Sequence, residues 1–257
     1  MGAGALTSSA MPTRAMLLAA GEGTRLRPLT ETVPKCMLPV AGKPVLEHNI
    51  EWLRKFGATD LVINLHYLPE AVVSHFGDGG RWGVRINYSV EPELLGTAGA
   101  VRNAARFFDG AFFVWYADNL STCRLDRLWE SHIARGGIAT MALHRRDDPT
   151  QSGIVGLDEN DRIVRFLEKP RPEQVFSHWV NAGILLLEPE VVDRIPARGA
   201  SDFGRDVFPA LLSAGAELNG YRMGEGEGLW WIDTAADFER VRSMAGERFK
   251  GTLAARD

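Results

Sequence analysis

An apolar segment that breaks abruptly into a glycine-rich loop is the feature that most limits how this chain can fold. Residues 14–20 form a short apolar run, which is typical of a buried strand. The loop that follows contains Gly21 and Gly23, which let backbone N–H groups approach a ligand closely. It delivers Arg25 and, ten positions later, Lys35. Such a loop can wrap a polyphosphate while two cations approach the same phosphates, so we expect an anion site here.

Two familiar nucleotide-binding motifs do not fit this loop. The Rossmann fingerprint requires a third glycine where the chain has Leu26, and no Gly-Lys-Ser/Thr sequence closes the loop as in a Walker motif. An ordinary strand-to-helix turn is the alternative interpretation. Such a turn requires neither the arginine nor the lysine, so phosphate binding remains favoured.

Beyond this loop the chain repeats the order strand, loop, helix. Short apolar runs alternate with segments whose apolar residues recur at helical spacing. Strands are expected over residues 14–20, 60–65, 84–90, 111–117, 139–144 and 180–187, and helices over residues 44–56, 69–76, 100–107 and 125–135. This alternation predicts an α/β protein with a three-layer α/β/α, Rossmann-like fold. Its central sheet should be mixed but mostly parallel, with ligands beyond the carboxyl ends of the strands.

The pattern changes after residue 150. Two short runs, 153–158 and 162–166, flank a polar turn and indicate a small β-hairpin that extends the sheet. The remaining elements are expected as helices over residues 190–195, 203–213 and 235–245 and strands over residues 218–223 and 229–232. We therefore expect a flexible tail over residues 1–13, followed by a single domain over residues 14–250.

Composition excludes several classes of protein. The formal net charge of −4 argues against nonspecific nucleic-acid binding, which usually requires a basic face. Cys36 and Cys123 are too few for a disulfide framework or a zinc quartet, and reduced thiols are typical of the cytosol. No signal peptide and no apolar run of about 18 residues is evident. We expect a cytoplasmic protein with no membrane or nucleic-acid partner, and a homo-oligomer is compatible with the sequence.

Two aspartates follow predicted strands, Asp118 and Asp233. Each could instead form a turn or a helix N-cap, Asp233 especially, because Thr234 and a helix come next. Mg²⁺ favours one or two carboxylates together with substrate phosphates. Beside a polyphosphate loop, both aspartates are therefore candidate Mg²⁺ ligands.

Three further segments have ordinary structural interpretations as well as functional ones. Glu168 and Lys169 follow the hairpin at once, where a solvated turn is common. The segment 91–99 contains further glycines after a strand and could be a simple connection. Trp230 and Trp231 are expected to pack in the core.

Together these motifs resemble those of the sugar-1-phosphate nucleotidyltransferases, also called nucleoside-diphosphate-sugar pyrophosphorylases. The family's leading motif, Gly-x-Gly-Thr-Arg-Leu followed by Pro-Lys, stands here at residues 21–26 and 34–35. In the family's order follow residues 96–99, Asp118 and the segments 168–170, 181–183 and 231–234. The resemblance covers about residues 14–245 and is closest to mannose-1-phosphate guanylyltransferase-like members without a β-helix domain.

The resemblance implies transfer of a nucleotidyl group from a nucleoside triphosphate to a sugar 1-phosphate, with Mg²⁺ as cofactor and pyrophosphate as the second product. The implied catalytic residues are Arg25, Lys35 and Asp118, and the implied Mg²⁺ ligands are Asp118 and Asp233. The implied nucleotide-binding residues are Ala20, Gly21, Gly23, Thr24, Glu91, Gly96 and Thr97. The implied sugar-phosphate-binding residues, beside the hairpin, are Glu168, Lys169, Asn181 and Gly183. Many family members have Gly-Asp at the first metal position, whereas this chain has Ala117-Asp118.

The nucleobase and the sugar remain open. The loop around Glu91 looks most like that of members that use GTP with mannose 1-phosphate or a heptose 1-phosphate. A carboxylate there could accept hydrogen bonds from guanine N1–H and N2–H₂. A UTP- or dTTP-dependent enzyme and a noncatalytic nucleotide-sugar-binding relative are the alternatives. A dinucleotide-dependent oxidoreductase is disfavoured by the missing third glycine.

Overall fold

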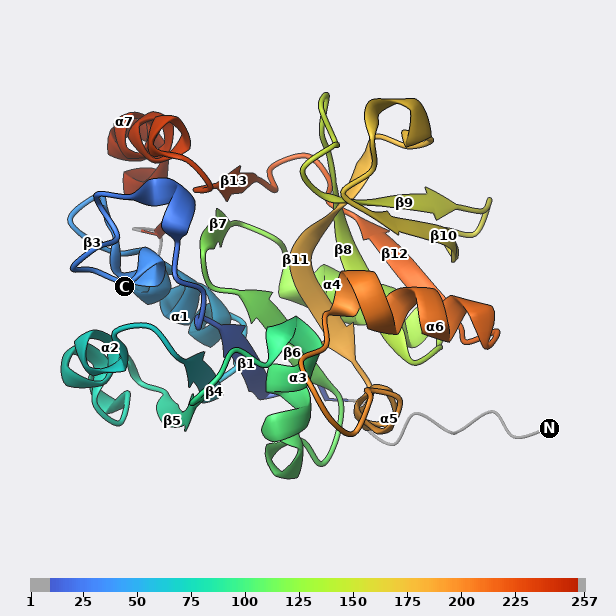
Figure 1. The fold of residues 1–257 in the computed structure, drawn as a ribbon, viewed down its shortest axis with the longest axis horizontal. Helices are drawn as coiled ribbons and strands as arrows, with labels where there is room; N and C mark the ends of the chain where they lie inside the picture. The colour runs from blue at the N-terminus through green and yellow to red at the C-terminus, as the bar shows by residue number, and fades with distance from the viewer. Residues whose placement is uncertain (1–9, 254–257) are drawn as a thin grey trace.

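The computed structural model describes the backbone of residues 10–253 and the side chains of residues 10–244. Within that range a nine-stranded sheet forms the centre of the molecule (Figure 1). Its strands follow the order β10 (Ile163–Glu168), β9 (Gly153–Leu157), β11 (Trp179–Leu187), β6 (Phe112–Tyr116), β1 (Arg14–Leu18), β4 (Asp60–Leu65) and β5 (Arg85–Val90), with β8 (Ala139–Arg145) beside β11 and β12 (Leu218–Arg222) beside β8.

The sheet is mixed, as expected, with one wholly parallel half and one half that contains the antiparallel strands β11 and β10. Strands β5, β4, β1 and β6 are parallel to one another, as in a doubly wound fold. Strand β11 runs antiparallel to β6, β8 and β9, and β9 and β10 form the expected antiparallel hairpin. The predicted α/β class with a hairpin extension is confirmed.

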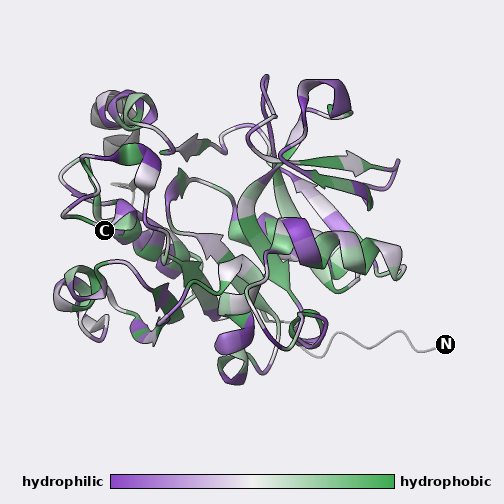
Figure 2. Cartoon of the chain, in the orientation of Figure 1, coloured by the Kyte–Doolittle hydropathy of each residue, from purple (hydrophilic) through white to green (hydrophobic). Residues whose placement is uncertain are grey.

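Alternating side chains in the strands fill an apolar layer on each face of the sheet. In β1, Ala15 and Leu17 join one buried cluster, and Met16 joins the other. The first cluster includes residues of α1 (Val45–Lys55), α2 (Pro69–Phe76) and α4 (Leu125–Arg135). The second includes residues of α3 (Gly96–Asn103), α5 (Pro189–Asp193) and α6 (Phe208–Ser213). Figure 2 shows the hydrophobic residues gathered along the central strands, so the layers are helix, sheet, helix.

A third apolar cluster lies outside these layers and joins distant segments of the chain. It contains Leu26 of the glycine-rich loop, Leu120, Ile232 and Phe238. The elements involved are β2 (Pro39–Val40), the start of α1, β7 (Asn119–Ser121), β13 (Leu229–Trp231) and α7 (Ala235–Leu253). Strand β2 pairs with β3 (Lys43–Pro44). Strand β13 lies within the strand expected over residues 229–232, but β7 and its antiparallel pairing with β13 were not indicated by the sequence pattern. This cluster holds the glycine-rich loop against both predicted aspartate positions.

The structure corrects the helix expected over residues 100–107. Helix α3 begins earlier, at Gly96, and ends at Asn103. Its first turn is stabilised from outside, because the carbonyl of Ser201 accepts hydrogen bonds from the N–H groups of Ala98 and Gly99 at 2.9 and 3.0 Å. Those donors have no partner within a helix, so a tertiary contact overrides the weak helix propensity of the glycines.

Other boundaries also differ. The helix expected over residues 203–213 is a π-helical turn (Phe203–Val207) followed by α6, and the last helix continues to Leu253. Residues 1–9 of the predicted tail lie outside the described residues, and Met11 already packs against the core. Among residues 10–253, no helix is long and apolar enough to cross a membrane.

Replacing Gly96 by alanine should destabilise the protein more than the same change at Gly199. Both residues have a positive φ, of 73° and 78°, so each alanine costs about 1–2 kcal/mol. A Cβ at Gly96 would also lie 2.5 Å from the Ser201 oxygen, whereas nothing lies within 4 Å at Gly199. We expect an additional loss of about 1–3 kcal/mol at Gly96. Urea unfolding measures both variants, and equal losses would contradict this packing role.

Candidate active site

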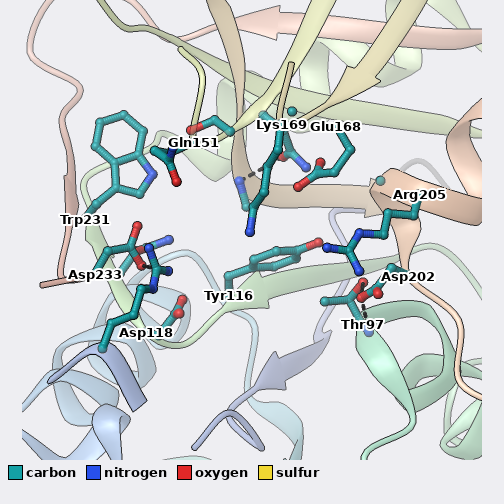
Figure 3. A pocket seen from close by; sticks show the side chains of 17 residues that line it. Thr97, Tyr116, Asp118, Gln151, Glu168, Lys169, Asp202, Arg205, Trp231 and Asp233 are labelled. Atoms are coloured by element: carbon teal, nitrogen blue, oxygen red, sulfur yellow. Dashed lines mark hydrogen bonds and ion pairs between the residues drawn. The ribbon is translucent and has the colours of Figure 1, made fainter. Parts of the chain in front are cut away.

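A cavity of about 290 Å³ opens between the β7–β13 ribbon, the end of β10 and the π turn (Figure 3). It lies beyond the carboxyl end of β6, where the fold was expected to bind ligands. Eight of the predicted site residues line it: Arg25, Thr97, Asp118, Glu168, Lys169, Asn181, Gly183 and Asp233. The structure thus brings together segments that are far apart in the sequence.

Two carboxylates converge on one buried ammonium group at one end of this cavity. Lys35 Nζ lies 2.6 Å from Asp118 Oδ2 and 3.1 Å from Asp233 Oδ1, and its side chain is 9% exposed. Burial alone would lower the pKa of Lys35, but the two carboxylates outweigh it and raise that pKa. Arg25 Nη2 lies 3.2 Å from Asp233 Oδ1. The two predicted cations and the two predicted metal ligands therefore form one ionic cluster.

The short β7–β13 ribbon places the two carboxylates side by side. Asn119 in β7 pairs with Trp231 in β13, so Asp118 precedes one strand and Asp233 follows the other at the same end. Helix α1 fixes the backbone here, because Asn49 Nδ2 donates hydrogen bonds to the carbonyls of Ala117 and Asn119 at 3.3 and 3.0 Å.

Asp233 does not cap the last helix. The cap is Thr234, whose Oγ1 accepts a hydrogen bond from the Asp237 N–H at 3.1 Å, while the Asp237 carboxylate accepts one from the Thr234 N–H. This reciprocal arrangement is a capping box with aspartate as its second member. The carboxylate of Asp233 is therefore left to face Lys35 and Arg25.

The same two carboxylates could hold a divalent cation. Within the described residues, no group of three or more His, Cys, Asp or Glu side chains is arranged to bind a metal. Asp118 and Asp233 nevertheless converge on a single positive charge. They could supply two oxygen ligands to Mg²⁺, which commonly completes its coordination with phosphates and water.

The glycine-rich loop packs closely on Lys35. Gly23 has a φ of 64°, and a Cβ there would lie 3.0 Å from both Lys35 Cβ and Thr30 Cγ2. Thr30 Oγ1 also donates a hydrogen bond to the Gly23 carbonyl at 2.8 Å. Ala20 is buried, whereas Gly21 and Thr24 are exposed on the loop. The glycine at position 23 is thus required by the approach of the loop to Lys35.

The structure corrects the role expected for Glu91. Its carboxylate is buried and accepts hydrogen bonds from Asn64 Nδ2 at 2.8 Å and from the Leu95 N–H at 3.1 Å. Asn64 Oδ1 in turn accepts a hydrogen bond from the Ala19 N–H. Both oxygens of Glu91 are engaged in joining strand ends, so this carboxylate does not face a nucleobase. Gly96, also predicted to bind nucleotide, packs against the backbone of Ser201 and does not line the cavity.

Thr97 belongs to the far end of the cavity, with residues that the sequence did not indicate. Its Oγ1 donates a hydrogen bond to Asp202 Oδ1 at 3.2 Å and accepts one from the Phe203 N–H at 2.9 Å. Tyr116 lines the same cavity. Thr97 therefore lies beside the turn at residues 202–204, which packs against the predicted sugar-phosphate residue Glu168.

Glu168 and Lys169 are presented to the cavity by the end of β10. Lys169 has a φ of 46°, which is strained for a residue with a side chain. Within the described residues its ammonium group makes no hydrogen bond or ion pair. Burial raises the pKa of Glu168, while the charge of Lys169 acts in the opposite direction. A strained residue with an unpartnered charge favours a binding role over the solvated turn that the sequence allowed.

A bulge in β11 shapes the floor of the cavity at Asn181 and Gly183. The pairing with β8 shifts register between Asn181 and Leu185, and Gly183 there has a φ of 71°. Asn181 Oδ1 accepts a hydrogen bond from the Gly183 N–H at 2.9 Å. A Cβ at Gly183 would lie 2.9 Å from the Tyr116 ring carbon Cγ, so a glycine is required beneath that ring.

Several lining residues were missed by sequence reasoning, among them Tyr116, Gln151, Asp202, Arg205 and Trp231. Trp231 packs against the first apolar cluster, as expected, but it also lines the cavity, and its ring centroid lies 4.4 Å from the Arg146 guanidinium carbon. Tyr116 reads as part of a buried strand, and Arg205 as part of a helical surface. Neither residue type nor spacing marks these positions in the sequence.

Comparison with known proteins gives consistent family matches. The model of the Nucleotidyl transferase family matches residues 14–236. The chain is 38% identical over 234 residues to the UTP–glucose-1-phosphate uridylyltransferase of Synechocystis, covering 86% of this chain and 59% of that protein. It is 37% identical over 233 residues to the mannose-1-phosphate guanylyltransferase of Mycobacterium tuberculosis, covering 90% of this chain and 63% of that protein. The chain thus spans less than two thirds of the length of both relatives.

A solved structure shows the same architecture. A Bacillus anthracis protein assigned as a glucose-1-phosphate thymidylyltransferase, in complex with sucrose, superposes with a TM-score of 0.81 at 26% identity. The superposition covers 91% of this chain and 95% of that one.

Replacing Lys35 by methionine should strengthen binding of Mn²⁺ in the absence of nucleotide. The ammonium of Lys35 occupies the space between both carboxylates, so a cation must compete with it. We expect affinity to rise about tenfold, which corresponds to about 1.4 kcal/mol of relieved charge competition. Electron paramagnetic resonance of free Mn²⁺ measures this binding. The control is Lys43→Met, which removes a lysine paired with Glu51 outside the cavity. Unchanged or weaker Mn²⁺ binding by Lys35→Met would contradict the arrangement.

Proposed function

Because this chain belongs to the Nucleotidyl transferase family, we propose that it transfers a nucleotidyl group from a nucleoside triphosphate to a sugar 1-phosphate. The observation that carries the proposal is the division of one cavity into two charged ends. An ionic cluster of Arg25, Lys35, Asp118 and Asp233 lies at one end. Glu168 and the unpartnered Lys169 are presented from the end of β10. This arrangement suits two phosphorylated substrates that must meet.

The chemical obstacle is the mutual repulsion of two polyanions. An oxygen of the sugar phosphate attacks the α-phosphorus in line, and pyrophosphate leaves with the electron pair of the broken P–O bond. The attacking oxygen is already ionised near neutral pH, so no general base is required. The protein has to hold both anions and neutralise the charge that develops on them.

We assign the charged residues to the two substrates by their position. Lys35 neutralises the triphosphate, and the planar guanidinium of Arg25 suits the leaving pyrophosphate. Lys169 holds the attacking phosphate, and Glu168, Asn181 and Gly183 hold the sugar. The exposed glycine-rich loop, with Gly21, Gly23 and Thr24, supplies backbone contacts to the nucleotide.

Asp118 and Asp233 would hold Mg²⁺, which neutralises charge on the triphosphate when it is bound. In the structure, the same carboxylates are paired with Lys35 and Arg25. A phosphate or Mg²⁺ that enters therefore has to share or displace these ion pairs.

GTP with mannose 1-phosphate or a heptose 1-phosphate is the favoured substrate pair. The resemblance of the loop around Glu91 and the guanylyltransferase of Mycobacterium tuberculosis support it. The carboxylate of Glu91 does not support a preference for guanine, because both of its oxygens accept hydrogen bonds within the protein. UTP is the second candidate, because the Synechocystis relative is a uridylyltransferase at 38% identity. Cytoplasmic location and a homo-oligomeric state stay predictions.

Pyrophosphate release tests the reaction and the substrates together. The protein is incubated with Mg²⁺, each of five nucleoside triphosphates, and mannose or glucose 1-phosphate. We expect release that depends on both substrates and is fastest with GTP and mannose 1-phosphate. No release with any pair, despite binding of a nucleotide sugar, would overturn the proposal in favour of a noncatalytic relative.

Single substitutions should separate the two ends of the cavity. Lys35→Ala and Asp118→Asn should each lower turnover by about 10²-fold or more, because each removes a preorganised charge from the reacting phosphates. Lys169→Met should chiefly raise the KM for the sugar 1-phosphate. Steady-state kinetics measures these effects. Rates like those of the unmodified protein in the first two variants would exclude the assigned roles.

A further inference from the structure

Arg205 is a cation of the cavity that no part of the proposed reaction uses. It lies in the π turn Phe203–Val207 and lines the cavity. Figure 3 shows it beyond the ring of Tyr116 as seen from Asp118 and Asp233. Within the described residues its guanidinium makes no hydrogen bond or ion pair. It therefore offers its N–H donors to whatever enters this end of the cavity.

The π turn that carries Arg205 is firmly held. Asp202 Oδ1 accepts hydrogen bonds from both the N–H and the Oγ1 of Thr97 at 3.2 Å, and the Asp202 N–H donates to Asp206 Oδ2 at 2.7 Å. The N–H groups of Asp206 and Val207 both donate to the Asp202 carbonyl. Such wide turns are frequent at functional sites. The backbone position of Arg205 on the cavity wall is thus set by the fold.

The same turn also fixes the position of Glu168. A Cβ at Gly204 would lie 2.4 Å from Glu168 Oε2, and a Cβ at Gly153 would lie 2.7 Å from the same oxygen. The Glu168 carboxylate therefore fits between the backbones of Gly153 and Gly204, and Gly204 directly precedes Arg205. Figure 3 shows Glu168 and Arg205 on the same side of the cavity, and the charge of Arg205 counteracts the effect of burial on the pKa of Glu168.

We propose that Arg205 is a specificity-determining residue that, together with Glu168, binds neighbouring hydroxyl groups of the sugar ring remote from its phosphate. The proposal rests on the proposed function. A guanidinium can only donate hydrogen bonds and an ionised carboxylate can only accept them, so the pair matches a vicinal diol. The sugar phosphate has to lie toward Lys169 and the Asp118–Asp233 end, where it attacks. The opposite side of the ring then meets Arg205.

Arg205→Ala should change recognition of the sugar while leaving that of the nucleotide intact. Loss of a hydrogen bond from a charged group corresponds to about 10- to 100-fold. We expect the KM for the preferred sugar 1-phosphate to rise by that factor, with the KM for the triphosphate unchanged within about twofold. Arg205→Lys keeps the charge but not the planar fork of donors, so its KM for the sugar 1-phosphate should lie between those of the unmodified protein and Arg205→Ala. Arg194→Ala is the matched control, since that exposed arginine pairs with Glu190 outside the cavity.

Monodeoxy sugar 1-phosphates distinguish recognition from a general structural effect. The unmodified protein should discriminate against the analogue that lacks the contacted hydroxyl by about 10-fold or more, and Arg205→Ala should lose that discrimination. If the unmodified protein is active and discriminates no more strongly than Arg205→Ala, the role of Arg205 is overturned while the proposed function stands. If the unmodified protein releases no pyrophosphate with any sugar 1-phosphate, the proposed function itself fails.

Discussion

The ammonium of Lys35 lies between carboxylates that are 83 and 198 positions away in the chain, and the geometry of the cavity depends on that contact. A charge this buried is strongly unfavourable without partners of opposite sign. The contact therefore requires the glycine-rich loop, the segment after β6 and the segment after β13 to meet at one place. It also keeps two carboxylates close together that would otherwise repel each other.

Apolar packing and a few buried polar groups supply the frame for this contact. The cluster around Leu26, Leu120 and Ile232 presses the three segments together, and the β7–β13 ribbon sets their register. On the other side of the glycine-rich loop, Glu91 and Asn64 connect the ends of β1, β4 and β5. These groups do not touch the cavity, yet they determine where its charged residues stand.

The sequence was informative where chemistry depends on a continuous motif. The alternation of strands and helices predicted the α/β class, and the loop with Arg25 and Lys35 led to the ionic cluster. It was less informative where a role depends on a distant partner. Glu91 resembled a base-reading residue, because its bonds to Asn64 and Leu95 cannot be seen in the chain. Gly96 resembled a loop residue, because the Ser201 carbonyl that stabilises its helix lies about a hundred positions away. Arg205 carried no signal at all, since one extra residue in a helical turn decides which way it faces.

The hairpin of β9 and β10 occupies the outer edge of the sheet, and it meets β11 at the pair Val180–Ile154. It carries Glu168 at its end and is followed by Lys169, whereas the ionic cluster lies next to the parallel strands. Substitutions, insertions or deletions in this peripheral hairpin can therefore reshape one half of the cavity without disturbing the order of the central strands. The architecture thus allows evolution to change the ligand groups that bind beside the hairpin while the ionic cluster at the other end of the cavity is kept.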